Sequence, residues 1–230
     1  MTRVANKIIV ALDVPSKMEM AALLGQLCDQ ISFFKIGLQL YTVGGPEVVV
    51  AVSAMGRKVF LDLKLHDIPN TVARAVEAAG SFNVPMMTIH LSGGGEMIRA
   101  AVAARPENMS IFGVTVLTSA SQDVLREIRV VGKVEDQVLR LAQLGVENGI
   151  DGIVASPQEI KPLRTEFGDR IRIVVPGIRP NWSKPGDQKR VMTPREAIDA
   201  GADYLVIGRP ITAHPNPREA VEQILEEIGS

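Results

Sequence analysis

The chain is poor in the features that mark several classes of protein. Its 230 residues contain one cysteine, Cys28, so no disulfide can form within the chain and a reducing compartment, the cytoplasm, is expected. The net charge is −1, so no general basic surface is expected to bind nucleic acid. The first apolar run, IIVAL, is too short for a signal peptide, and no run approaches the length of a membrane span. Partners among nucleic acids and membranes are therefore not expected.

Short runs typical of β-strands alternate with helical patterns along the whole chain. The predicted strands cover residues 8–13, 32–38, 58–65, 86–91, 110–117, 152–156, 172–178 and 204–208. Helices are predicted between them, for example at 18–28, 71–82, 134–149 and 217–229. This alternation indicates βαβ units and a parallel sheet. Eight units in 230 residues predict a single-domain (β/α)₈ barrel over residues 1–230, with a doubly wound open sheet as the alternative.

Polar residues gather where the predicted strands end, and in a barrel of this kind the active site lies at the carboxyl ends of the strands. Asp62 and Lys64 are two apart on a strand, so they are expected to share the face that points into the barrel mouth. There they would meet Asp13 and Lys35, and alternating carboxylates and ammonium groups keep one another ionised. A purely structural ion-pair network is the alternative. Buried ion pairs stabilise proteins poorly, so a functional array is favoured.

A metal site is the alternative to this array. Asp13, Asp62, His66 and His90 could supply ligands, but Lys35 and Lys64 at the same mouth would repel a divalent cation. No HxxxH spacing occurs in the sequence. No metal is therefore expected, and the histidines are interpreted as structural groups.

The loops after the seventh and eighth predicted strands indicate a phosphate site. They read VVPGIRP and VIGRPITA, which supply Gly177, Arg179, Gly208 and Arg209. Glycine allows backbone N–H groups to approach an anion, and arginine provides two parallel donors. These two loops often bind phosphate in (β/α)₈ barrels. The long polar segment 179–194 is predicted to be a loop, and loops of that length are usually functional or disordered.

Seven segments together resemble one enzyme family. They are ALDV (11–14), FFKIGL (33–38), DLKLHDIPNTV (62–72), VTVLTS (114–119), PGIRP (176–180), GDQKRVMTP (186–194) and VIGRPIT (206–212). In these motifs and in their order the chain resembles the orotidine 5′-phosphate decarboxylases, and the bacterial type in particular. The resemblance implies that orotidine 5′-monophosphate loses CO₂ to give UMP, the last step of de novo pyrimidine synthesis. It also implies a reaction without a cofactor and a homodimer with its sites at the interface.

The resemblance further implies a role for individual residues. The charged array would consist of Lys35, Asp62, Lys64 and Asp67, with Asp67 given to the site of the neighbouring subunit. Lys64 would stabilise a carbanion at C6 of the pyrimidine and then protonate it, while Asp62 would lie near the departing carboxylate. The implied substrate contacts are Asp13 and Lys35 at the ribose hydroxyls, Thr118 at the pyrimidine amide, Arg179, Gln188, Gly208 and Arg209 at the phosphate, and further contacts from Asp62 and Thr71. Gln188 would sit on a loop, 179–194, that closes over the phosphate.

Two other functions stay open at this point. A sugar-phosphate decarboxylase or epimerase on a related barrel would need a divalent metal. A nucleotide-phosphate binder without catalytic activity would have no need of Lys64 beside Asp62.

Overall fold

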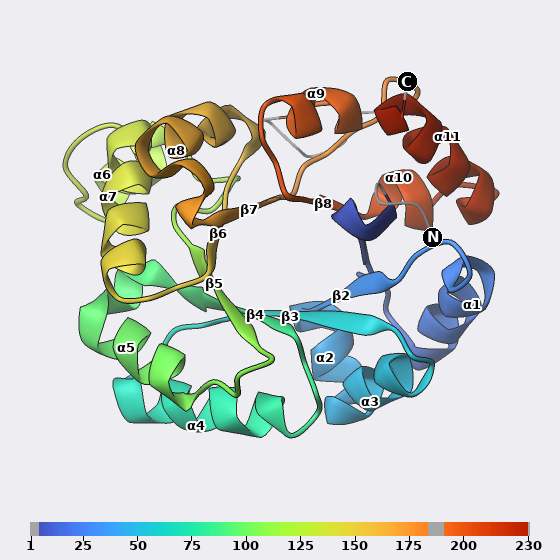
Figure 1. Ribbon diagram of the computed structural model, residues 1–230, viewed down its shortest axis with the longest axis horizontal. Helices are drawn as coiled ribbons and strands as arrows, with labels where there is room; N and C mark the ends of the chain where they lie inside the picture. Colours follow the sequence, from blue (N-terminus) through green and yellow to red (C-terminus); the bar gives the residue numbers. More distant parts are fainter. Residues whose placement is uncertain (1–4, 184–190, 230) are drawn as a thin grey trace.

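The computed structural model describes residues 5–183 and 191–229 of the chain. Eight parallel strands close into a barrel in which each strand pairs with the next and β8 pairs with β1. The strands are β1 (Ile8–Ala11), β2 (Phe33–Gly37), β3 (Lys58–Leu65), β4 (Met86–His90), β5 (Ser110–Val114), β6 (Gly152–Val154), β7 (Arg172–Val175) and β8 (Tyr204–Ile207). Figure 1 shows them as a central ring surrounded by helices. The predicted single-domain (β/α)₈ barrel is confirmed, and the open sheet is excluded.

Helices connect the strands on the outside of the barrel. They are α1 (Lys17–Leu27), α2 (Leu38–Gly44), α3 (Pro46–Ala54), α4 (Pro69–Gly80), α5 (Gly94–Ala104), α6 (Gln122–Glu127), α7 (Val134–Glu147), α8 (Ile160–Phe167), α9 (Pro194–Asp199), α10 (Arg209–Thr212) and α11 (Pro217–Gly229). The four helices that the sequence predicted are α1, α4, α7 and α11. In the described part of the chain, no helix is both long and apolar enough to cross a membrane.

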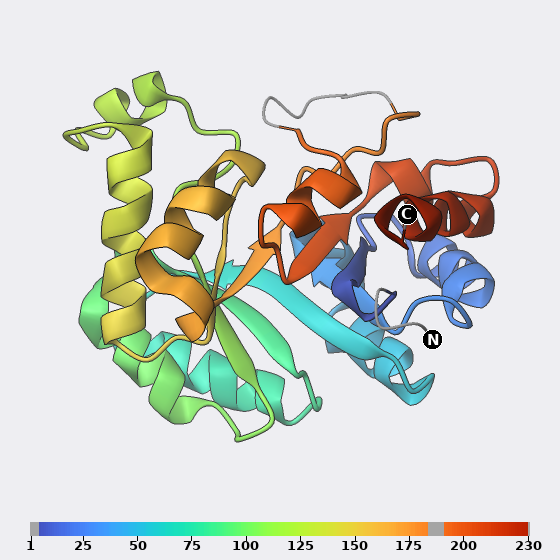
Figure 2. The ribbon, with the colours of Figure 1, turned by 45° about the horizontal axis from the view of Figure 1, so that its top comes forward.

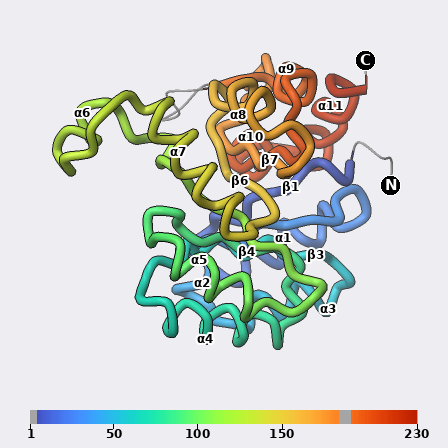
Figure 3. Tube along the Cα trace, turned by 60° about the vertical axis from the view of Figure 1, so that its left-hand side comes forward, coloured from blue at the N-terminus to red at the C-terminus, as the bar shows by residue number. Residues whose placement is uncertain are grey.

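The two ends of the chain close the ring of helices. Figure 2 shows α11 beside α1, and Arg218 Nη2 lies 2.6 Å from Asp29 Oδ2 across their junction. One helix departs from the compact ring, because α6 projects away from the rest of the molecule in Figure 3.

Alternate strand residues pack in two layers, one inside the barrel and one beneath the helices. The inner layer is formed by Ile9, Ala11, Phe33, Phe60, Met86, Phe112, Val174 and Val206. The rings of Phe60 and Phe112 meet edge to face with 6.3 Å between their centroids. Residues of the other face, such as Ile8 and Val10, join the larger core under the helices. Because both faces are buried, the strands are apolar almost throughout.

Several strands end earlier than the sequence predicted. The runs predicted at 8–13, 110–117, 152–156 and 172–178 end as strands at Ala11, Val114, Val154 and Val175. Buried apolar residues such as Leu12, Val116 and Ile178 continue past the strand ends, so hydrophobicity alone extends the prediction into the loops. Those loops form the mouth of the barrel.

Two carboxylates tie the amino-terminal end of the barrel together. Asp151, just before β6, accepts a hydrogen bond from the backbone N–H of Ile111 on β5 at 2.8 Å and pairs with Arg105 at 2.6 Å. Asp203, just before β8, does the same for the N–H of Ile173 on β7 and pairs closely with Arg164. These two carboxylates therefore serve stability, since the site lies at the opposite end of the barrel.

We expect Asp151→Ala to lower the free energy of unfolding by about 2 kcal/mol, because it leaves the Ile111 N–H without its side-chain acceptor and Arg105 with only the Gly149 carbonyl. Urea unfolding at pH 7 measures the change. The control is Asp123→Ala, which removes an exposed pair with Arg126 and should cost about 0.5 kcal/mol or less. Equal effects of the two substitutions would contradict the structural role of Asp151.

Candidate active site

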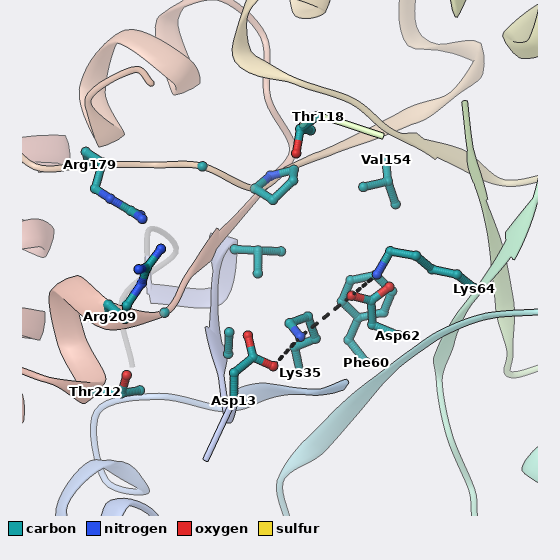
Figure 4. A pocket seen from close by; sticks show the side chains of 15 residues that line it. Asp13, Lys35, Phe60, Asp62, Lys64, Thr118, Val154, Arg179, Arg209 and Thr212 are labelled. Atoms are coloured by element: carbon teal, nitrogen blue, oxygen red, sulfur yellow. Dashed lines mark hydrogen bonds and ion pairs between the residues drawn. The ribbon is translucent and has the colours of Figure 1, made fainter. Parts of the chain in front are cut away.

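A cavity of about 450 Å³ opens at the carboxyl ends of the strands. It is lined by Ala11, Asp13, Lys35, Phe60, Asp62, Lys64, Thr118, Val154, Pro176, Gly177, Arg179, Val206, Gly208, Arg209 and Thr212. Figure 4 shows Arg179 and Arg209 on one side and Asp62 and Lys64 on the other. The cavity is large enough for a small organic ligand and separates two kinds of polar group.

The charged side of the pocket continues the inner layer of the barrel. Side chains two apart on a strand face the same way, so Asp13 follows Ala11 and Lys35 follows Phe33 on the inner face. Asp62 follows Phe60 in the same manner. The inner face is therefore apolar in the barrel and charged at its mouth, and Phe60 and Ala11 form part of the pocket floor.

Four charged groups form an alternating chain across the mouth. Lys35 Nζ lies 2.8 Å from Asp13 Oδ1 and 3.6 Å from Asp62 Oδ2, and Lys64 Nζ lies 2.8 Å from the same Asp62 oxygen. Lys35 and Asp62 are buried, with 7% and 8% of their surface exposed. The two cations thus share one buried carboxylate.

The surroundings of Asp62 keep this carboxylate ionised. Burial by itself raises the pKa of Asp62, but the ammonium groups of Lys35 and Lys64 and hydrogen bonds from Lys64 and Thr88 lower it by more, so the pKa lies below its usual value. Asp62 therefore carries its negative charge at neutral pH, where it balances the two lysines.

Strand β3 is irregular where it carries the array. The backbone of Lys64 is in the left-handed region, with φ of 51°, which is uncommon for a residue other than glycine. The pairing of β3 with β4 shifts register between Leu61 and Leu65. Asp62 and Lys64 do face each other, as predicted, but the regular alternation from which this was predicted does not hold at Lys64. A bulge brings the two side chains together instead.

The opposite side of the pocket is suited to an anion. Arg179 and Arg209 approach it from the loops after β7 and β8, and Gly177 and Gly208 lie in the same loops. Gly177 has a φ of 79°, which a side chain would strain. Arg179 is held in place by a hydrogen bond from its N–H to the Met192 carbonyl at 3.0 Å, so the two ends of the loop after β7 meet beside the pocket.

The remaining predicted residues divide into three groups. Thr118 lines the pocket. Asp67 and Thr71 are exposed and do not line it, and the Asp67 carboxylate accepts a hydrogen bond from the N–H of Ile68 at 2.7 Å. Gln188 lies outside the described residues, together with the rest of 184–190 in the predicted closing loop. Within the described residues, no three His, Cys, Asp or Glu side chains gather into a set that could hold a metal ion.

Two residues that sequence reasoning missed shape the array. A Cβ atom on Gly37 would lie 2.6 Å from Lys35 Nζ and 3.0 Å from Asp13 Oδ1, so only glycine leaves room for this ion pair. Thr88, on β4, contacts both Asp62 and Lys64. The signal for Gly37 was its inner-face position two residues after Lys35, and that for Thr88 was a polar residue between the apolar Met87 and Ile89 in the middle of β4.

Comparisons with known proteins agree with this geometry. The model of the orotidine 5′-phosphate decarboxylase / HUMPS family matches residues 6–224. The chain belongs to this family. It is 48% identical over 232 residues to an orotidine 5′-phosphate decarboxylase of Moorella thermoacetica, which covers 97% of this chain and 92% of the relative. It is 45% identical over 233 residues to that of Heliobacterium modesticaldum, with 97% and 96% covered.

A solved structure of the family extends the agreement to the fold. The crystal structure of orotidine 5′-phosphate decarboxylase from Lactobacillus acidophilus superimposes with a TM-score of 0.86 at 36% identity, covering 98% of this chain and 100% of that one. The resemblance found in the seven sequence motifs is therefore confirmed at the level of the family.

One histidine beside the array makes stability depend on pH. Burial, together with the nearby His66 and Lys64, lowers the pKa of His90, although Asp62 opposes the shift. The ring of His90 lies 5.5 Å from that of His66. Because the native pKa is lower than the unfolded one, the unfolded chain takes up the proton first as the pH falls.

We therefore expect the native state to lose stability as the pH falls through about 6.5 toward the native pKa of His90. His90→Gln should remove this part of the loss, so its melting temperature should fall less between pH 8 and pH 5.5. Thermal unfolding of both chains across this range is the measurement. Parallel curves for the two chains would contradict the assignment.

Proposed function

We propose that this chain decarboxylates orotidine 5′-monophosphate to UMP and CO₂. The observation that carries the proposal is a single pocket with an alternating array of lysine and aspartate on one side and two arginines on the other. An anionic group held by Arg179 and Arg209 would place the rest of a nucleotide toward the array. Membership of the family supports this substrate over other phosphate esters.

The other pocket residues fit the parts of such a substrate. Asp13 and Lys35, which are paired to each other, can bind the ribose hydroxyls in the middle of the pocket. Thr118 can hydrogen-bond the amide of the pyrimidine. Gly208 and Arg209 would bind the phosphate with Arg179, and Gln188 on the loop 179–194 would close over it. The phosphate is remote from the reacting carbon, so its binding energy can be used to order the array.

The chemistry of the array matches the needs of this decarboxylation. The bond between C6 and the carboxyl carbon breaks, CO₂ departs, and the electron pair stays on C6 in an orbital that the ring does not delocalise. A fixed ammonium group beside C6 stabilises that charge, and a proton from Lys64 Nζ then completes UMP. Lys64 regains its proton from solvent. Every step uses groups of the chain and water, so the proposed reaction needs no cofactor.

Asp62 has two possible contributions to this reaction. Its carboxylate would lie near the substrate carboxylate, and repulsion between them would ease the departure of CO₂. It also keeps Lys64 charged and aimed, because Lys64 Nζ lies 2.8 Å from Asp62 Oδ2. The second contribution rests directly on this contact and is the one that we favour.

Asp67 and Thr71 support a shared site in a homodimer. Both are exposed and outside the pocket of their own chain, although the family resemblance implies that both serve a substrate site. A two-fold axis would bring each of them to the site of the neighbouring subunit. With one cysteine, such a dimer is suited to the reducing cytoplasm.

The first test is an assay with orotidine 5′-monophosphate in excess chelator, followed by the loss of its ultraviolet absorbance. We expect full turnover under these conditions. A metal-dependent sugar-phosphate enzyme on the same barrel would be inactive with this substrate and would lose its own activity to the chelator. A nucleotide binder without catalytic activity would retain the substrate unchanged.

Lys64→Ala should remove nearly all turnover, at least about 1,000-fold, because Lys64 is the proposed proton donor and Lys35, which also approaches Asp62 Oδ2, is paired with Asp13. Steady-state kinetics with the purified variant measure the loss. Lys58→Ala is the matched control, since Lys58 is exposed at the opposite end of the same strand. A Lys64→Ala chain with a tenth of wild-type kcat would rule Lys64 out as the proton donor.

Arg209→Ala should lower kcat/KM for the whole substrate by roughly 30-fold, which is about 2 kcal/mol for a charged contact to phosphate. The same variant should act on the nucleoside without phosphate as well as the wild type does. Arg170→Ala, at the other end of the barrel, is the control and should match the wild type on both substrates. An equal loss on both substrates would show that Arg209 does not bind the phosphate.

Mixing two inactive variants tests the shared site. In a mixed dimer of Lys64→Ala and Asp67→Ala chains, one site holds both substitutions and the other holds neither. Random exchange makes half of the dimers mixed, so roughly a quarter of wild-type activity should return. The measurement is turnover after complete subunit exchange, verified with labelled chains.

The control for this experiment mixes Lys64→Ala with Asp62→Ala chains. Both residues belong to the same site because they are in contact within one chain, so each site of the mixed dimer keeps one substitution and no activity should return. If the Asp67 mixture behaves in the same way as this control, Asp67 serves its own chain.

A further inference from the structure

The bulge in β3 has one residue of β4 opposite it. Leu61 pairs with Met87 and Leu65 with Ile89. Three residues of β3, numbers 62 to 64, therefore stand against Thr88 alone. The bulge contains both Asp62 and Lys64, so the contacts of Thr88 with the bulge affect the charged array directly.

The hydroxyl of Thr88 bonds to both members of that contact. Its oxygen accepts a hydrogen bond from the backbone N–H of Lys64 at 2.9 Å, and its proton is donated to Asp62 Oδ1 at 3.0 Å. Thr88 is completely buried. The other oxygen of the same carboxylate, Oδ2, binds Lys64 Nζ. The hydroxyl, the carboxylate and the two ends of Lys64 thus form a closed ring of contacts.

We propose that Thr88 is a positioning residue that aims Lys64 at the substrate. The left-handed backbone of Lys64 is strained for a residue with a side chain, and the bond from its N–H to Thr88 holds it there. The bond to Oδ1 fixes the rotation of the Asp62 carboxylate, and Oδ2 in turn fixes the ammonium group. Without the hydroxyl, the backbone of Lys64 loses its hydrogen bond to Thr88, and the carboxylate that holds the ammonium group is free to rotate.

This inference rests on the proposed decarboxylation. Substitutions of Thr88 distinguish the positioning role from a merely structural one. Thr88→Ser and Thr88→Ala both lack the methyl group and differ only in the hydroxyl. We expect kcat of the alanine variant to be at least tenfold lower than that of the serine variant, because small displacements of a reacting group cost large factors in rate. The serine variant should stay within about threefold of the wild type. Binding of UMP, measured by calorimetry, should differ less than threefold between the two variants.

A second buried threonine supplies the matched control. The hydroxyl of Thr115 is buried and has no hydrogen-bond partner among the described residues. Thr115→Val should leave kcat within about twofold of the wild type. Thr88→Val, which keeps the shape of the side chain, should behave like Thr88→Ala, and if the valine chain does not fold, the pair of serine and alanine variants decides.

The outcomes are distinguishable. If the wild type decarboxylates the substrate and the alanine variant comes within tenfold of the serine variant, the role of Thr88 is overturned and the proposed function stands. It is also overturned if the alanine variant loses UMP binding in the same proportion as kcat, since that reports general damage to the pocket. An inactive wild-type chain would overturn both proposals.

Discussion

The buried carboxylate of Asp62 holds the whole candidate site together. It receives the ammonium group of Lys64 at 2.8 Å, lies 3.6 Å from that of Lys35, and accepts the Thr88 hydroxyl at 3.0 Å. Removing a charge from water is costly, and an ion pair rarely recovers more than this cost. Stability alone would favour an apolar cluster at this position. The array is therefore best explained by what two fixed cations beside a pocket can do to a bound substrate.

The barrel can accommodate such an array because its inner face is apolar in the interior and carries charged side chains only at the mouth. Phe33 and Phe60 belong to the inner layer of the barrel, and two residues further along their strands the same face carries Lys35 and Asp62 at the mouth. Among the described strands, the register shifts only between β3 and β4, at the bulge that carries Lys64. The bulge brings Lys64 Nζ against the same Asp62 oxygen that Lys35 Nζ approaches, so two cations share one carboxylate oxygen. The rigid strands fix the tips of long side chains that would otherwise be mobile.

Much of this arrangement could be predicted from the sequence, because it follows from the alternation of strands and helices and from the polar residues at the ends of the strands. Alternating strands and helices indicated the barrel. Because a barrel brings the carboxyl ends of its strands together at one mouth, the sequence also predicted that Asp13, Lys35 and Asp62 lie close together. The bulge could not be predicted, since it depends on how β3 and β4 pair across a gap of many residues. The importance of Gly37 and Thr88 depends on distances of about 3 Å that no pattern encodes. The interpretation of Asp67 came from the family resemblance alone, because its own chain keeps it outside the pocket.

We propose that Lys64 stabilises negative charge at C6 of the pyrimidine. The most direct measurement follows the C6 hydrogen of UMP by NMR in D₂O with the protein present, because exchange of this hydrogen passes through the same carbanion without any loss of CO₂. We expect the wild type to catalyse the exchange, and we expect Lys64→Ala, with UMP still bound, not to exceed the rate in buffer. Exchange at the wild-type rate in the Lys64→Ala chain, or a wild type that decarboxylates but does not exchange, would contradict this proposal.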